Sequence, residues 1–153
     1  MRLNWHKESP EAYKAMLTLQ NVVDKSSIDH KLLELIKIRA SQINGCAHCL
    51  EMHTKDAIAL GENDQRLHLL AAWKEAPFYS EKERVALAWC ESLTNISSEG
   101  APENILKELH KFFTKEEIVD LTLGIVAING WNRLAVAFKS DVGNYVSNLK
   151  PVK

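Results

Sequence analysis

The chain has 153 residues, of which 46% are hydrophobic and 25% charged, with a formal net charge of −1 at pH 7. These values are typical of one globular domain over 1–153, and the near-neutral charge gives no basis for nucleic acid or an anionic membrane as a partner. No apolar stretch approaches the ~20 residues of a membrane helix and the N-terminus lacks a signal peptide's apolar core, so we expect a cytoplasmic protein with no membrane partner.

The first half of the chain predicts four helices, because apolar residues recur at helical spacing between residues that stop helices. Ser9-Pro10 has the form of an N-cap followed by a first helical residue. Gly45 supplies a C-terminal stop between the second and third helices. We expect these helices at residues 10–23, 29–43, 46–61 and 63–73.

The second half predicts three more helices, two of which open with capping boxes. These boxes are Ser80-Glu81-Lys82-Glu83 and Thr114-Lys115-Glu116-Glu117. A helix at 102–113 lies between them, and the last helix runs from its box to about residue 138. Residues 121–128 would also suit a buried strand, but the capped start and the length favour a helix. We find no alternating strand pattern and expect an all-α fold, a compact multi-helix domain of about seven helices without a sheet.

The chemistry-bearing feature is Cys46-Ala-His-Cys49, with His53 four residues later and Glu34 twelve residues earlier. Two thiols three residues apart can close into a disulfide and reopen, the minimum for two-electron redox chemistry. At the start of a helix, the N-terminal dipole stabilises a thiolate, and Cys49 and His53 are neighbours at i, i+4. His53 can take the thiol proton or pair with the thiolate, and Glu34 can orient His53. His48 points roughly 100° away from Cys49, at the entrance or as a proton buffer.

Other interpretations of the cysteines remain open. The pair can be purely structural, or it can bind zinc together with a histidine. The usual second pair of zinc ligands is missing, because His68 and His110 are isolated, so we expect no metal and no cofactor. Cys90, beside Trp89 in a predicted helix, is expected to be a buried apolar filler. A thioredoxin-like fold would need strands between the helices, and none is predicted.

The spacing Glu, eleven residues, Cys-x-x-Cys, three residues, His resembles the alkylhydroperoxidase D core of the carboxymuconolactone decarboxylase superfamily. Every spacing matches, and the surrounding residues 38–45 also resemble the family. The similarity is specific over about 32–61, which places the core of the domain at about 29–61. The resemblance implies an all-α homo-oligomer, commonly a trimer or hexamer, that reduces hydroperoxides or exchanges dithiols and disulfides.

The resemblance also implies a role for each residue of the motif. Cys49 would be oxidised to a sulfenic acid, and Cys46 would donate a proton and then close the disulfide. Glu34, His48 and His53 would form a proton relay. The implied partners are a hydroperoxide substrate and an external thiol or dithiol reductant. The decarboxylase branch works without this cysteine pair, so the dithiol argues against lactone decarboxylation.

We therefore predict a thiol-dependent peroxidase or dithiol–disulfide oxidoreductase, in which Glu34→Gln and His53→Gln lower turnover without unfolding the chain. The alternative is a non-enzymatic redox-sensing or oligomeric module, whose disulfide switches a helix interface. A hydrolase or decarboxylase would need polar groups that hold a substrate. The candidates for that role are Arg39, Trp131 and Arg133, residues that more often pack or pair between helices.

The segment 119–137 is apolar nearly all round, which favours association of this chain with copies of itself. Within it, Ile-Asn-Gly at 128–130 repeats the tripeptide at 43–45. A shared tripeptide is weak support for an internal duplication, and we attribute it to chance.

Overall fold

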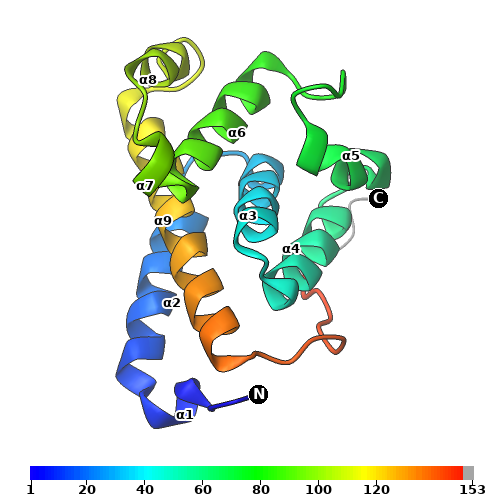
Figure 1. The fold of residues 1–153 in the computed structure, drawn as a ribbon, viewed down its shortest axis with the longest axis vertical. Coiled ribbons are helices and arrows are strands. Elements are labelled where there is room, and N and C mark those ends of the chain that lie inside the picture. Colours follow the sequence, from blue (N-terminus) through cyan, green and yellow to red (C-terminus); the bar gives the residue numbers. More distant parts are fainter. Residues whose placement is uncertain (150–153) are drawn as a thin grey trace.

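The computed structural model describes residues 1–149, and within this range the chain is built from α-helices without any strand (Figure 1). The all-α prediction is confirmed, with two short helices, α1 and α7, beyond the seven expected. Residues 150–153 of the predicted domain lie outside the described residues. The elements are α1 (Trp5–Glu8), α2 (Pro10–Asp24), α3 (His30–Asn44), α4 (Ala47–Ala59), α5 (Asp64–Leu69), the 3₁₀ turn η1 (Leu70–Ala72), α6 (Glu81–Thr94), α7 (Ile96–Glu99), α8 (Glu103–Leu109) and α9 (Lys115–Phe138).

Helix α3 lies at the centre of the molecule, where it contacts α4, α6, α9 and η1 (Figure 1). Its start is fixed by Asp29, whose side chain accepts a hydrogen bond from the Leu32 N–H at 3.1 Å. Its end is fixed by Gly45, at a φ of +65° that a residue with a side chain rarely adopts. Cys46 follows at once as the N-cap of α4. The turn at Gly45 therefore places the two cysteines directly after the central helix.

Helix α9 is the longest element, and it begins with the predicted capping box at Thr114. By length and composition it could cross a membrane, contrary to the prediction that no such stretch exists, and 39% of its most apolar window is buried within the chain. Its contacts with α2, α3, α4 and α6 account for much of its apolar character. On its outer face, Val119 and Val126 are 65% and 52% exposed.

Two predicted helices are shorter than expected. The segment 63–73 is α-helical only to Leu69 and continues as the 3₁₀ turn η1. After this turn the Arg84 guanidinium donates to the carbonyl oxygens of Trp73, Lys74 and Ala76. The segment 102–113 is helical only over Glu103–Leu109. Tight turns then carry the chain to Phe113, which is buried in the core.

Beyond α9 the chain continues without helix as the C-terminal segment, residues 139–149, which runs back toward α4 (orange to red in Figure 1). The Gly143 N–H donates to Glu51 at 2.6 Å, and Lys55 donates to the Tyr145 carbonyl oxygen at 2.7 Å. The Met1 amine pairs with Asp141 at 2.7 Å. These contacts attach the segment to α4 and to the N-terminus of the chain.

Candidate functional site

Cys46 and Cys49 are joined by a disulfide at the N-terminus of α4. Their Cα atoms are 5.4 Å apart, because the N-cap residue and the third helical residue lie one turn from each other. The Cys49 N–H also donates to the Cys46 sulfur at 3.3 Å. The two residues are only 1% and 3% exposed. The spacing therefore does form a disulfide, and it is buried.

One turn further along α4, His53 meets Glu34 of α3, as the motif predicts. The ring Nδ1 of His53 lies 2.8 Å from Glu34 Oε2. The other carboxylate oxygen of Glu34 accepts from the Lys37 ammonium at 2.8 Å, and both side chains of this second pair are less than 10% exposed. Lys37 was missed in the sequence, where its spacing of three from Glu34 was the only available signal.

The Glu34 carboxyl is ionised although it is buried. Burial would raise its pKa, but the hydrogen bond and charge of His53 and the Lys37 ammonium outweigh burial and lower the pKa below its ordinary value. An ionised carboxylate can only accept hydrogen bonds, so Nδ1 of His53 carries the hydrogen that Glu34 binds. This leaves Nε2 of His53 as the ring nitrogen that can exchange a proton with a neighbouring sulfur.

A second carboxylate, Asp56, completes the surroundings of His53. One oxygen of Asp56, one of Glu34 and a ring nitrogen of His53 lie within 4.8 Å of one another. The Tyr145 hydroxyl of the C-terminal segment is 2.9 Å from both oxygens of Asp56. Because Lys37 and Tyr145 already bind the two carboxylates, hydrogen bonds account for this cluster and we assign no metal to it. The His-x-x-Asp spacing was visible in the sequence, whereas nothing linked Tyr145 to it.

His48, the remaining predicted residue of the relay, lies apart from the Glu34–His53 pair. Its Nδ1 is 2.7 Å from the carbonyl oxygen of Asp141 in the C-terminal segment. It is partly exposed, and its charge adds to burial in lowering the pKa of His6 from the N-terminal segment. His48 therefore stands at the surface, where the C-terminal segment meets the start of the chain.

The other candidates take part in packing. Arg39 pairs with Glu91 at 2.7 Å, and the Arg133 guanidinium donates to the Asn129 carbonyl oxygen at 2.9 Å. The Trp131 indole donates to a side chain of α2 at 3.1 Å. Cys90 is fully buried as predicted, and burial raises the pKa of its thiol to about 12. It has no part in the dithiol centre.

The two copies of Ile-Asn-Gly contact each other through asparagines. Asn44, at the end of α3, donates to Asn129 at 3.0 Å and to Asn132 at 2.9 Å, both on α9. Asn132 in turn donates to the Ser41 hydroxyl at 3.0 Å. These bonds hold the end of α3 against α9, directly before the first cysteine. The repeated tripeptide thus has a packing role that the sequence did not indicate.

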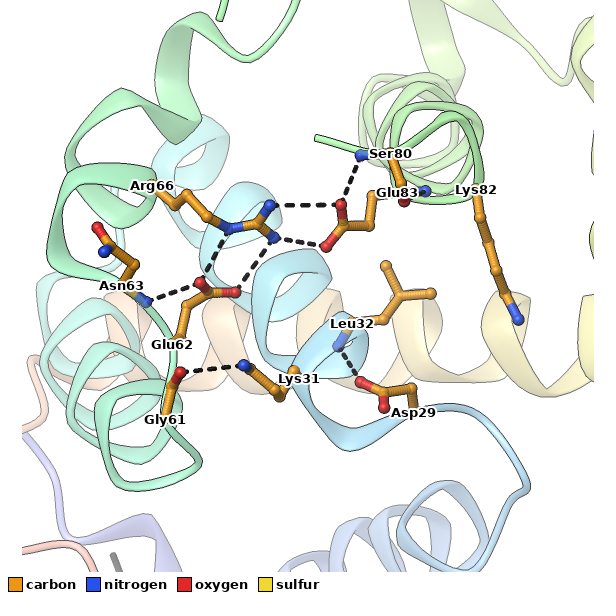
Figure 2. Close-up of a pocket in the computed structure, with 10 residues that line it drawn as sticks. All are labelled: Asp29, Lys31, Leu32, Gly61, Glu62, Asn63, Arg66, Ser80, Lys82 and Glu83. Carbon is orange, nitrogen blue, oxygen red and sulfur yellow. Dashed lines mark hydrogen bonds and ion pairs between the residues drawn. The ribbon is translucent and has the colours of Figure 1, made fainter. Parts of the chain in front are cut away.

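A cavity of about 650 Å³ lies beyond the end of α4, lined in part by Gly61, Glu62 and Asn63 (Figure 2). Its charged side chains bind one another: Arg66 donates to Glu62 at 2.9 Å and to Glu83 at 2.5 Å. Lys31 donates to the carbonyl oxygen of Gly61 at 3.0 Å. These ion pairs link α5 to α6, and the charges of Arg66, Glu62 and Glu83 already bind one another.

Comparisons with known proteins give relatives over most of the chain. Residues 10–92 match the model of the carboxymuconolactone decarboxylase family. The uncharacterized protein YdfG of Bacillus subtilis is 42% identical over 89% of this chain and 92% of its own. The crystal structure of a protein of unknown function from Agrobacterium tumefaciens, considered a candidate AhpD antioxidant defence protein, has a TM-score of 0.89 and 43% identity over 99% of both chains. The debrominase Bmp8 shares the fold at a TM-score of 0.78 and 22% identity, over 90% of this chain and 74% of Bmp8.

Proposed function

Because this chain belongs to the carboxymuconolactone decarboxylase family and has the fold of its alkylhydroperoxidase D members, we propose that it is a thiol-dependent peroxidase acting through Cys46 and Cys49. One observation carries the proposal: a disulfide has formed one helical turn from His53, whose imidazole is hydrogen-bonded to the buried Glu34 carboxylate. The nucleophile Cys49, the base His53 and the Glu34 carboxylate that orients the base are thus arranged in that order.

The reaction begins with the reduced pair. Nε2 of His53 takes the proton of Cys49, and the thiolate attacks the distal oxygen of the hydroperoxide. The O–O bond breaks, the Cys49 sulfur is oxidised to a sulfenic acid, and the alkoxide leaves as an alcohol with the proton of Cys46. The Cys46 thiolate then attacks the Cys49 sulfur and expels hydroxide, which leaves as water with the proton held by His53. The products are one alcohol, one water and the Cys46–Cys49 disulfide.

An external thiol or dithiol would restore the pair, and a reducing cytoplasm would supply it. We propose that the protein works there as a homo-oligomer, a trimer or hexamer, with the exposed apolar residues of α9 at the contact. His48 would serve the relay from the entrance, through the ring nitrogen that Asp141 does not bind.

The test is peroxide consumption with excess dithiol, followed together with the intact mass of the protein after brief exposure to peroxide. We expect Cys46→Ser to accumulate one added oxygen on Cys49, and Cys49→Ser to consume no peroxide. Cys90→Ser is the matched control and should behave as the wild type, because Cys90 is buried away from the pair.

The competing function is a redox-sensing module whose disulfide switches the contact between α3 and α4. Stopped-flow oxidation of the reduced protein separates the two functions. A second-order rate near that of free cysteine at the same pH would contradict the peroxidase and support the sensor. A faster rate that falls in His53→Gln and Glu34→Gln would support the peroxidase, because both variants impair removal of the thiol proton.

A further inference from the structure

Tyr145 brings the C-terminal segment to the dithiol site, although it lies 89 residues from its partner in the sequence. Its hydroxyl is 2.9 Å from each oxygen of Asp56. The backbone holds it in place from both sides, since the Gly143 N–H binds Glu51 and the Tyr145 carbonyl oxygen binds Lys55. The hydroxyl is therefore directed at Asp56 by contacts that do not involve Asp56.

Asp56 needs such a partner because of what it could otherwise bind. It follows His53 by three residues, and one of its carboxylate oxygens, one of Glu34 and a ring nitrogen of His53 lie within 4.8 Å of one another. Nδ1 of His53 already donates to Glu34, so Nε2 is the nitrogen left for Cys49. Without the tyrosine, the Asp56 carboxylate would be free to accept a hydrogen bond from the imidazole and to stabilise its doubly protonated form.

We propose that Tyr145 is a positioning residue of the dithiol site, whose hydroxyl holds the Asp56 carboxylate and keeps Nε2 of His53 free for proton exchange with Cys49. The proposal rests on the proposed function for its chemical consequence, because only a redox-active Cys49 needs that nitrogen. Its structural part, control of Asp56 and of the imidazole, stands on the contacts alone.

The charges around His53 set the direction of the expected effect. Glu34 and Lys37 face it from α3, Asp56 and Cys49 share its helix, and the C-terminal segment contributes Tyr145. Burial, together with the charges of Asp56 and Glu34, raises the pKa of Tyr145, so the phenol remains a neutral donor. Removing the hydroxyl leaves the negative charge of Asp56 unbound beside the imidazole, and this stabilises the imidazolium.

The experiment is an NMR titration of the histidine imidazoles in the disulfide form, where no thiol of the pair titrates and no turnover is needed. We compare wild type, Tyr145→Phe, Asp56→Asn and the double variant. We expect Tyr145→Phe to move the titration midpoint of His53 upward by about one pH unit, the low end for a charge at this distance. In the Asp56→Asn background the same change should have no effect, because the carboxylate that tyrosine controls is absent.

The amide signal of Gly143 reports whether the C-terminal segment stays bound to α4 in Tyr145→Phe. An unchanged His53 midpoint with that signal in place would overturn the proposal, as would the same upward shift in the Asp56→Asn background. If the segment detaches in Tyr145→Phe, the proposal is overturned, because the hydroxyl then serves to bind the segment to α4 and not to position Asp56.

A pH profile of peroxide reduction, measured on the same variants, tests the chemical consequence. The acidic limb should move upward in Tyr145→Phe by the same amount as the NMR midpoint. A wild-type protein that consumes no peroxide would overturn the proposed function while the NMR comparison still decides the role of Tyr145. An NMR shift with an unmoved acidic limb would overturn the link to Cys49.

Discussion

Glu34→Gln is the most informative substitution, because the buried Glu34 carboxylate binds two partners at once. It accepts from Lys37 and from His53, each at 2.8 Å. Without its charge, the Lys37 ammonium, with a side chain only 9% exposed, has lost its counter-ion. Breaking a buried ion pair by removing one partner costs about 3–5 kcal/mol. Because glutamine keeps the shape and one accepting oxygen, we expect the low end, about 3 kcal/mol.

The sign of the pH dependence follows from the lowered pKa of Glu34. A carboxyl whose pKa is lower in the folded chain than in the unfolded chain adds stability above the unfolded value, and this stability is lost as the pH falls through the folded value. The ordinary value for Glu34 is 4.5. The difference in the free energy of unfolding between wild type and Glu34→Gln should therefore reach its full size at neutral pH. It should shrink as the pH falls below 4.5.

The assay is urea unfolding of the disulfide form, followed by circular dichroism over a range of pH. Lys37→Met is the control, and the double variant Glu34→Gln/Lys37→Met should be more stable than Glu34→Gln because the orphaned ammonium is gone. The sequence-based prediction that Glu34→Gln stays folded is compatible with this cost, since domains are stable by about 5–15 kcal/mol. Equal stability of wild type and Glu34→Gln at neutral pH, or a difference that does not change with pH, would refute the reasoning.

Three further predictions concern other parts of the chain. After brief alkylation of the reduced native protein, peptide mapping should find no label on Cys90, because burial raises the pKa of its thiol to about 12. Early label on Cys90 would contradict this. Gly45→Ala should lower the free energy of unfolding by about 1–2 kcal/mol, because alanine is strained in the left-handed conformation. The new Cβ adds no clash, since nothing lies within 4 Å of it. A much larger loss in urea unfolding would contradict this. Val126→Glu on α9 should reduce the molecular mass of the oligomer measured by light scattering. Val22→Glu on α2, where the side chain is similarly exposed, should leave that mass unchanged. An unchanged mass in Val126→Glu would exclude this face of α9 as the oligomer contact.

Local signals in the sequence predicted much of the fold, because caps and stops act within a few residues. The capping boxes at Ser80 and Thr114 are both present, and the helix that Thr114 opens ends at Phe138, as predicted. Gly45 stops α3 as predicted, since only its backbone adopts the required φ without strain. The sequence did not indicate the Arg84 guanidinium that binds the carbonyl oxygens after η1, because it approaches from another helix.

In the candidate site, too, local contacts were predictable from the sequence and long-range contacts were not. The pairing of Cys46 with Cys49 and the meeting of His53 with Glu34 follow from short spacings on consecutive helices. Lys37 had the appearance of an ordinary exposed lysine, and its burial is set by how α3 packs in the finished fold. Contacts made by the C-terminal segment and by the asparagines of α9 join residues more than 80 positions apart, and a single sequence carries no signal for such pairs.

The fixed charges around His53 decide whether the proposed proton transfer can occur. Transfer of a proton from Cys49 to His53 creates a thiolate and an imidazolium together, so it moves charge within the cluster without changing its total. The total is set by the fixed charges, two carboxylates from Glu34 and Asp56 against one ammonium from Lys37. Without Lys37 the buried site would hold a second uncompensated negative charge, which would raise the carboxyl pKa values and discourage a thiolate beside them. The lysine that the motif omits is thus as necessary to the proposed chemistry as the histidine that the motif contains.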